Sequence, residues 1–305
     1  HVGECPPGSV LLNVRKAEAG DVPTLVDLYE RAYHGGYSAS FDRYGPITPQ
    51  DFWWIQSEKQ VLLMEVNHRP VGMVIIGRRE GALVVEEALG DLLQPRPGLD
   101  GAAAKAEQAL LGRLGAFLLQ HFRKERQERL LLRTAEANPL ALALARSLDL
   151  AFVNALVVTT LRPRRQTGRG PEGYAIRKAL PADAADIVRI HHECFQTAPS
   201  PDEVDRLLRR SQARGWVAER EGYRLGFLLA EAHGGGFGDL VVGVREAHRR
   251  KGVGRALATS ALNFFAARQI PALGLYWGLD GAAHAFYRGL GFATERVYLF
   301  FEKPL

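Results

Sequence analysis

The stretch that decides the fold is DLVVGVREAHRRKGVGRALATSALNFFAARQ, residues 239–269. Its valine-rich start is typical of a buried strand, and its long apolar-periodic end is typical of a helix. The basic turn between them has the pattern Arg249-x-x-Gly252-x-Gly254. Glycine lets successive backbone NH groups face one concavity at a helix start, where the helix dipole favours an anion such as a diphosphate. The alternative interpretation is a solvated basic turn before an ordinary helix.

A second pattern follows the strand-like run ALGLYW in the stretch LDGAAHAFYRGLGF, residues 279–292. Its spacing is N/D-x-x-A-x-x-x-Y-x-x-x-G-F, formed here by Asp280, Ala283, Tyr287, Gly291 and Phe292. The two patterns together, in this order, resemble the Gcn5-related N-acetyltransferase (GNAT) superfamily. The resemblance covers residues 174–305.

This resemblance implies that acetyl-CoA binds as co-substrate where two parallel strands separate. Its pantetheine would pair with the backbone of Val242, Gly243 and Val244. Its diphosphate would lie on the glycine turn, formed by Arg249, Arg250, Lys251, Gly252, Val253, Gly254 and Arg255. Tyr287 would protonate the leaving CoA thiolate, although a packed aromatic side chain is the structural alternative. No metal is implied.

Asp280 stands where the family usually has asparagine. Its short side chain can cap the following helix, but its negative charge lies unfavourably near a polyanionic substrate. We therefore expect a capping role first and a contact with the cofactor second.

The acceptor must lose a proton before it can attack, usually to a carboxylate or a histidine. The candidates are Glu231 and His233 at the end of one expected strand, Glu219 on another, and Asp239 at the start of the valine-rich strand. We favour Glu231 and Asp239 as the base. Each could equally be a solvated carboxylate at a strand end.

The chain also repeats itself. VRKAEAGDVPTLVDL, from Val14, corresponds to IRKALPADAADIVRI, from Ile176, so that Arg15 and Asp21 correspond to Arg177 and Asp183. Further matches follow in the same order along both halves. Strands and helices alternate in each copy, which predicts a mixed α/β (α+β) sheet and two tandem acyl-CoA N-acyltransferase (GNAT) domains. The expected divisions are a first domain at 10–162, a linker rich in Pro, Gly and Arg at 163–173, and a second domain at 174–305.

The first copy lacks the chemistry of the second. AAAKAE, residues 102–107, replaces the glycine turn, and Ala145 stands in the place of Tyr287. We expect a degenerate domain that shapes the acceptor site, supports the second domain or mediates assembly.

Composition limits the remaining classes. With 47% hydrophobic and 24% charged residues, the 305-residue chain can form ordinary globular cores. There is no apolar run of membrane-spanning length and no signal-peptide pattern, so we expect a cytoplasmic protein without a membrane partner. Two cysteines, Cys5 and Cys194, cannot form a disulfide framework. Outside the glycine turn, the basic residues cluster only in the linker, and no aromatic residues are interleaved with them. This pattern argues against nucleic-acid binding.

The sequence thus predicts an N-acetyltransferase that moves acetyl from acetyl-CoA to a small-molecule or peptide amine, by direct attack in a ternary complex. The alternative is a non-catalytic acyl-CoA-binding or protein-interaction module on the same fold. We also consider a homodimer. The sequence does not identify the acceptor.

Overall fold

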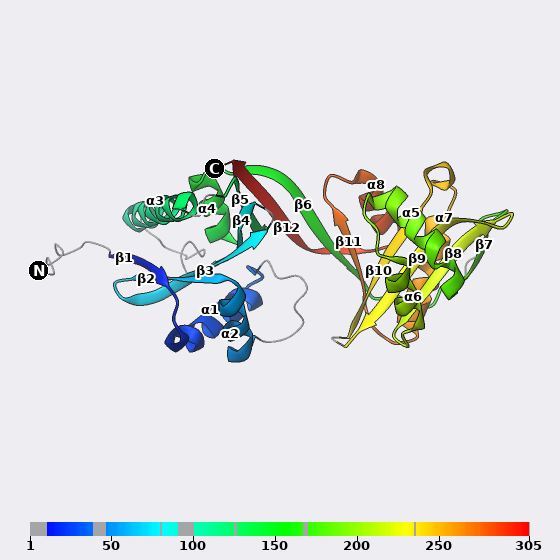
Figure 1. The fold of residues 1–305 in the computed structure, drawn as a ribbon, viewed down its shortest axis with the longest axis horizontal. Coiled ribbons are helices and arrows are strands. Elements are labelled where there is room, and N and C mark those ends of the chain that lie inside the picture. The colour runs from blue at the N-terminus through cyan, green and yellow to red at the C-terminus, as the bar shows by residue number, and fades with distance from the viewer. Residues whose placement is uncertain are drawn as a thin grey trace, which may run out of the picture. The chain divides into compact units, whose positions relative to one another are not determined.

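The computed structural model describes residues 11–38, 47–79, 81–90, 101–124, 127–166, 170–234 and 236–304. The chain forms two compact units (Figure 1). Unit 1 comprises His1–Leu156 and Arg296–Leu305, and unit 2 comprises Val157–Glu295. None of the helices in the described part of the chain combines the length and the apolar composition that a membrane span requires.

Unit 1 is built on a mixed sheet with the strand order β1-β2-β3-β4-β5-β12. Neighbouring strands from β1 to β4 are antiparallel, whereas β4 and β5 are parallel. Besides β12, which is described below, the elements of this unit up to residue 147 are β1 (Leu12–Lys16), α1 (Val22–His34), α2 (Pro49–Glu58), β2 (Gln60–Val66), β3 (Arg69–Arg79), β4 (Ala82–Gly90), α3 (Gly101–Lys124), β5 (Arg129–Ala135) and α4 (Pro139–Ser147).

Unit 2 repeats this succession with the strand order β7-β8-β9-β10-β11-β6. The predicted fold class and the predicted repeat are therefore confirmed. Its own elements are β7 (Ala175–Lys178), α5 (Ala184–Phe195), α6 (Pro201–Arg209), β8 (Ala213–Arg220), β9 (Tyr223–His233), β10 (Phe237–Val244), α7 (Val253–Ala266), β11 (Ala272–Trp277) and α8 (Gly281–Gly289).

The same ion pair starts both copies. Arg15 lies 2.7 Å from Asp21 and 2.9 Å from Glu65. Its counterpart Arg177 lies 2.8 Å from Asp183 and 2.9 Å from Glu219. The guanidinium of Arg177 is the main reason why the pKa of Asp183 lies well below its usual range. The residues that matched in sequence thus fasten the first helix to the sheet in each unit.

The two units exchange their last strands. β6 (Ala151–Leu161) and β12 (Ala293–Pro304), green and red in Figure 1, each have residues in both units. In unit 1, β12 pairs antiparallel with β5 from Tyr298↔Ala135 to Pro304↔Arg129. In unit 2, β6 lies next to β11, and the Thr159 hydroxyl donates a 3.0 Å hydrogen bond to the Gly274 carbonyl.

This exchange departs from the predicted division into 10–162, 163–173 and 174–305, which follows the order of the sequence. The last strand of the first copy reaches unit 2, and the end of the chain returns to unit 1. The first residues of the predicted linker are also attached to unit 2. Asn263 on α7 holds the backbone of Gln166 through two hydrogen bonds, at 2.8 and 2.9 Å.

Helices cover opposite faces of the unit 2 sheet. Ile187 of α5 and Val204 of α6 pack with Phe227 of β9 in one apolar cluster. On the other face, α7 lies so close to β10 that a Cβ at Gly238 would come within 2.1 Å of Phe265. Because side chains alternate along a strand, the next residue, Asp239, points to the face of α5 and α6.

We expect the exchanged strand to stabilise unit 2. A fragment of residues 157–295 should unfold at a temperature several degrees higher than a fragment of residues 174–295, because only the longer one carries β6 beside β11 and the Thr159 hydrogen bond, together worth on the order of 1–2 kcal/mol or more. Thermal unfolding followed by circular dichroism measures the difference. Both fragments lack 296–305, so the return of β12 cannot mask the effect. Equal midpoints would contradict a stabilising role for β6.

Candidate active site

The turn between β10 and α7 has the backbone that the glycine pattern predicts. Arg250 and Gly252 both have positive φ, 63° and 82°, and α7 begins at Val253 with Gly252 as its N-cap. No side chain caps this helix start. The first NH groups of a helix have no partner within it, so those of Val253, Gly254 and Arg255 are open to an anion.

The basic side chains of this turn are exposed, and two of them brace it. The Arg249 Nε donates to the Val244 carbonyl at 2.9 Å, and one of its terminal nitrogens lies 3.8 Å from the Cys194 sulfur. Arg255 donates to the carbonyl of Gly289, at the end of α8, at 3.1 Å. Arg249 therefore fixes the end of β10, while Arg250 and Lys251 project around the turn.

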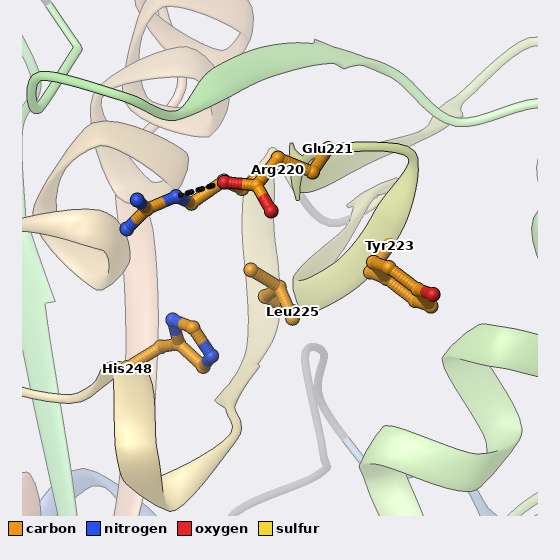
Figure 2. A pocket seen from close by; sticks show the side chains of 5 residues that line it. All are labelled: Arg220, Glu221, Tyr223, Leu225 and His248. Atoms are coloured by element: carbon orange, nitrogen blue, oxygen red, sulfur yellow. Dashed lines mark hydrogen bonds and ion pairs between the residues drawn. The ribbon is translucent and has the colours of Figure 1, made fainter.

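An open cavity of about 260 Å³ borders the turn at His248. Figure 2 shows its lining, which is formed by Arg220, Glu221, Tyr223, Leu225 and His248. The hydroxyl of Tyr174 lies 2.9 Å from the Nδ1 of His248, and the guanidinium of Arg220 lies over the Tyr174 ring. The lining contains no residue that the sequence assigns to acetyl-CoA or to catalysis. Its visible role is to hold His248, the residue before Arg249, in place.

β10 and β11 separate soon after they begin. They pair in parallel at Gly238↔Ala272 and Asp239↔Leu273, whereas β10 continues to Val244 and β11 to Trp277. On its other side β10 stays paired with β9 as far as Val244↔Gly226. The edge of Val242, Gly243 and Val244 that faces away from β9 therefore borders the opening between the two parallel strands.

Tyr287 projects from α8 towards this opening. The residue is buried, its ring stacks on Tyr276 at 5.6 Å, and a Cβ at Gly274 would come within 2.3 Å of it. Burial raises the pKa of Tyr287 well above its ordinary value, a hydrogen bond with the Leu275 backbone opposes this rise, and the charge of Asp239 adds to it. The phenol therefore holds its proton at neutral pH and can act as an acid.

Asp280 is the N-cap of α8. One of its carboxylate oxygens accepts hydrogen bonds from the backbone NH groups of Ala282 and Ala283, both at 3.0 Å. This is the capping role expected from the sequence.

The candidate bases lie in different surroundings. Glu231 accepts a 2.9 Å bond from Arg210, and Glu219 is held by Arg177. Asp239 lies opposite Glu231 in the strand register and 3.1 Å from the Nε2 of His233. The sequence analysis includes both His233 and Asp239 among the candidate bases. Their contact could not be predicted from the sequence, because it depends on the register of β9 and β10.

The corresponding region of unit 1 is filled by the unit itself. Asn138, the counterpart of Asp280, caps α4 and donates 2.9 Å hydrogen bonds to the carbonyls of Ala88 on β4 and Tyr37. Buried Ser38 donates to Glu87 of β4 at 2.8 Å. α3 begins at Gly101, so AAAKAE belongs to the helix and forms no glycine turn. The insert before it, residues 91–100, lies outside the described residues.

Comparisons with known proteins agree with this geometry. Residues 184–292 match the model of the Acetyltransferase (GNAT) family. The fold is similar to that of a GCN5-related N-acetyltransferase from Sphaerobacter thermophilus, with a TM-score of 0.61, 15% identity, and coverage of 96% of this chain and 95% of that one. It is also similar to a tandem GNAT protein from the clavulanic acid biosynthesis pathway, with a TM-score of 0.59, 15% identity, and coverage of 96% and 98%. Residues 184–292 thus match the GNAT family, and the fold of the chain is similar to that of a tandem GNAT protein.

Two curated proteins are also similar to this chain in sequence. The chain is 32% identical over 144 residues to a mycothiol acetyltransferase of Streptomyces avermitilis, across 43% of this chain and 47% of that protein. It is 30% identical over 146 residues to a mycothiol acetyltransferase of Streptomyces coelicolor, across 44% and 47%. The chain thus matches about half the length of these curated relatives.

We expect the Arg249→Glu variant to bind acetyl-CoA about tenfold more weakly or worse, because it removes the brace on Val244 and reverses a charge beside the glycine turn. Isothermal titration of acetyl-CoA measures the change. The matched control is Arg146→Glu, the same charge reversal at an exposed arginine of unit 1. Equal affinity for both variants and the wild type would contradict the assignment of the diphosphate to this turn.

Proposed function

We propose that this chain is an acyltransferase that moves acetyl from acetyl-CoA to an amine acceptor, by direct attack in a ternary complex. One observation carries the proposal: a buried, protonated phenol, Tyr287, lies at the opening between β10 and β11, and an open helix start lies at the end of β10. An acid for the leaving thiolate and a binding site for the diphosphate are two of the features that such a transfer needs.

The residues of unit 2 fit acetyl-CoA. The free edge of Val242, Gly243 and Val244 offers backbone groups to the pantetheine amides, as an added strand would use them. The diphosphate would lie against the NH groups of Val253 to Arg255, where Gly252 provides the left-handed turn. A side chain at Gly254 would press on Phe286, at 3.2 Å, which favours glycine at this close approach.

Tyr287 would supply the proton that the CoA sulfur takes as the carbon–sulfur bond breaks. Burial keeps the phenol protonated before the reaction, although the raised pKa by itself makes it a weaker proton donor. We assign Tyr287 as the general acid because its ring lies against Gly274 of β11, beside the opening where the thiolate would form.

We further propose that unit 1 binds no acetyl-CoA. Its β4 and β5 pair from Ala82↔Arg129 to Val85↔Leu132, and the polar groups beyond that point are used internally by Asn138, Glu87 and Ser38. Its role would be to support unit 2 or to contribute to acceptor binding.

The acceptor is a small-molecule amine in this proposal. The names of the two Streptomyces relatives make amines related to mycothiol the first acceptors to test. A wider set of amines and N-terminal peptides should follow, with CoA release as the readout. A chain that binds acetyl-CoA but acetylates no amine in such a set would support the alternative, a non-catalytic acyl-CoA-binding module.

The stoichiometry of binding tests the difference between the units. We expect one acetyl-CoA per chain by isothermal titration, because in unit 1 AAAKAE lies within α3 instead of forming a glycine turn, and Ala145 stands in the place of Tyr287. Two equivalent sites per chain would show that unit 1 retains the function.

The Tyr287→Phe variant should lower kcat by about a hundredfold or more, because it removes the proton donor and keeps the ring. Acetyl-CoA affinity should change little, since the expected contacts lie on β10 and α7. The neighbouring Tyr276 provides the matched control: its hydroxyl lies 2.8 Å from the Nδ1 of His284, so Tyr276→Phe also removes a buried hydroxyl. If both variants keep the wild-type kcat when chemistry limits turnover, Tyr287 is not the acid.

A further inference from the structure

We propose that His233 is the general base that takes the proton from the acceptor amine, and that Asp239 is the residue that positions it. The inference rests on the proposed acetyl transfer and names a residue that neither the family match nor the relatives assign. It also replaces the sequence-based preference for Glu231 and Asp239 as the base.

The first argument is the place of the pair in the sheet. Asp239 occupies the last paired position before β10 and β11 separate. His233, the last residue of β9, lies opposite Phe237 of β10 in the register. The pair therefore lies at the closed end of the opening, with Asp239 on β10, the strand that would bind the pantetheine, and His233 on the neighbouring β9.

The second argument is that the imidazole is oriented. The His233 ring stacks on Phe237 with centroids 4.7 Å apart and planes 20° from parallel. Its Nε2 is buried and lies 3.1 Å from an Asp239 carboxylate oxygen, within ion-pair distance but without the angles of a hydrogen bond. The negative charge of that carboxylate favours a proton on Nε2, and a small rotation of either side chain would complete the hydrogen bond, which leaves the Nδ1 lone pair to accept another proton. A carboxylate that fixes the tautomer of a histidine base is a recurrent catalytic arrangement.

The third argument is that the pair and the acid act from opposite faces of the sheet. Asp239 points to the face of α5 and α6, because Gly238 before it faces Phe265 of α7. Tyr287 lies on the other face, over Gly274. Both side chains of the pair keep access to solvent, with exposed fractions of 35% for His233 and 45% for Asp239. An acceptor could therefore reach His233 from the face of α5 and α6, away from the acid.

The fourth argument is that Glu231, the other carboxylate on this face, is already held by a partner and is less available as the base. Glu231 shares the face of His233, but Arg210 holds it in an ion pair at 2.9 Å. Among the described residues, Asp239 contacts His233, and Glu231 lies two residues before it on the same face with Arg210 as its partner.

The proposed step balances as follows. His233 Nδ1 takes one proton from the acceptor ammonium, and the freed nitrogen lone pair forms a bond to the acyl carbon. The carbon–sulfur bond breaks, and the sulfur takes the proton of Tyr287. The second proton on the new amide nitrogen returns to the Tyr287 phenolate through water, and His233 releases its proton to solvent.

The decisive experiment compares two acceptors in the wild type and in His233→Gln. With an aliphatic amine, which is protonated at pH 7, the variant should lose about a hundredfold or more in kcat/KM. With a weakly basic amine such as a hydrazide, which is already neutral at pH 7, it should lose less than about fivefold, because no base is needed. Asp239→Asn should show the same contrast with a smaller loss. His192→Gln, at an exposed histidine of α5, is the matched control and should leave both rates unchanged.

A purely structural role for His233 would reduce both acceptors equally, and that result would overturn the proposal. A variant with full activity on both acceptors would overturn it as well. Added imidazole should restore the His233→Ala variant on the aliphatic amine, which gives a second readout independent of His233→Gln. A wild-type chain that acetylates no amine would refute the proposed function itself, and the base with it.

Discussion

The separation of β10 from β11 after Asp239 is the constraint on which the rest of the site depends. Two parallel strands that stayed paired would leave no backbone groups for a substrate and no space for a side chain between them. Because pairing stops at Asp239↔Leu273, one edge of β10 is available along Val242 to Val244. Gly274 then lets the ring of Tyr287 lie directly against β11. The opening thus brings a strand edge, an acid and the Asp239 carboxylate together.

Unit 1 has the same fold, and its parallel strands β4 and β5 also stop pairing partway, after Val85↔Leu132. The two units share their order of elements and their first ion pair, so they differ in the side chains around this point and not in the scaffold. In unit 1, the amide of Asn138 donates hydrogen bonds to the carbonyls of Ala88 on β4 and of Tyr37, and AAAKAE lies within helix α3. The Ala88 carbonyl is thus satisfied by the unit itself, which favours a structural role over a binding site at this place.

Much of the fold and of the candidate site could be predicted from the sequence, and the features that could not be predicted depend on contacts between distant segments. The glycine turn and the Tyr287 pattern are local, so their residues determine the backbone and the family that were found. The strand exchange is not local: β6 and β12 are equivalent strands of a repeat, and nothing in their apolar alternation selects β5 or β11 as neighbour. The His233–Asp239 contact also escaped, because it needs the β9–β10 register and the face of the sheet that Phe265 closes.

The charge of Asp239 links the proposed base to the acid. Burial is the main reason for the raised pKa of Tyr287, and the negative charge of Asp239 raises it further. When His233 accepts a proton, the His233–Asp239 pair becomes neutral overall, and the influence of Asp239 on the phenol weakens. Tyr287 would then become a better proton donor at the moment when the acceptor nitrogen has become a nucleophile. In the proposed mechanism, activation of the amine would therefore favour, through Asp239, the proton transfer that accompanies departure of the thiolate.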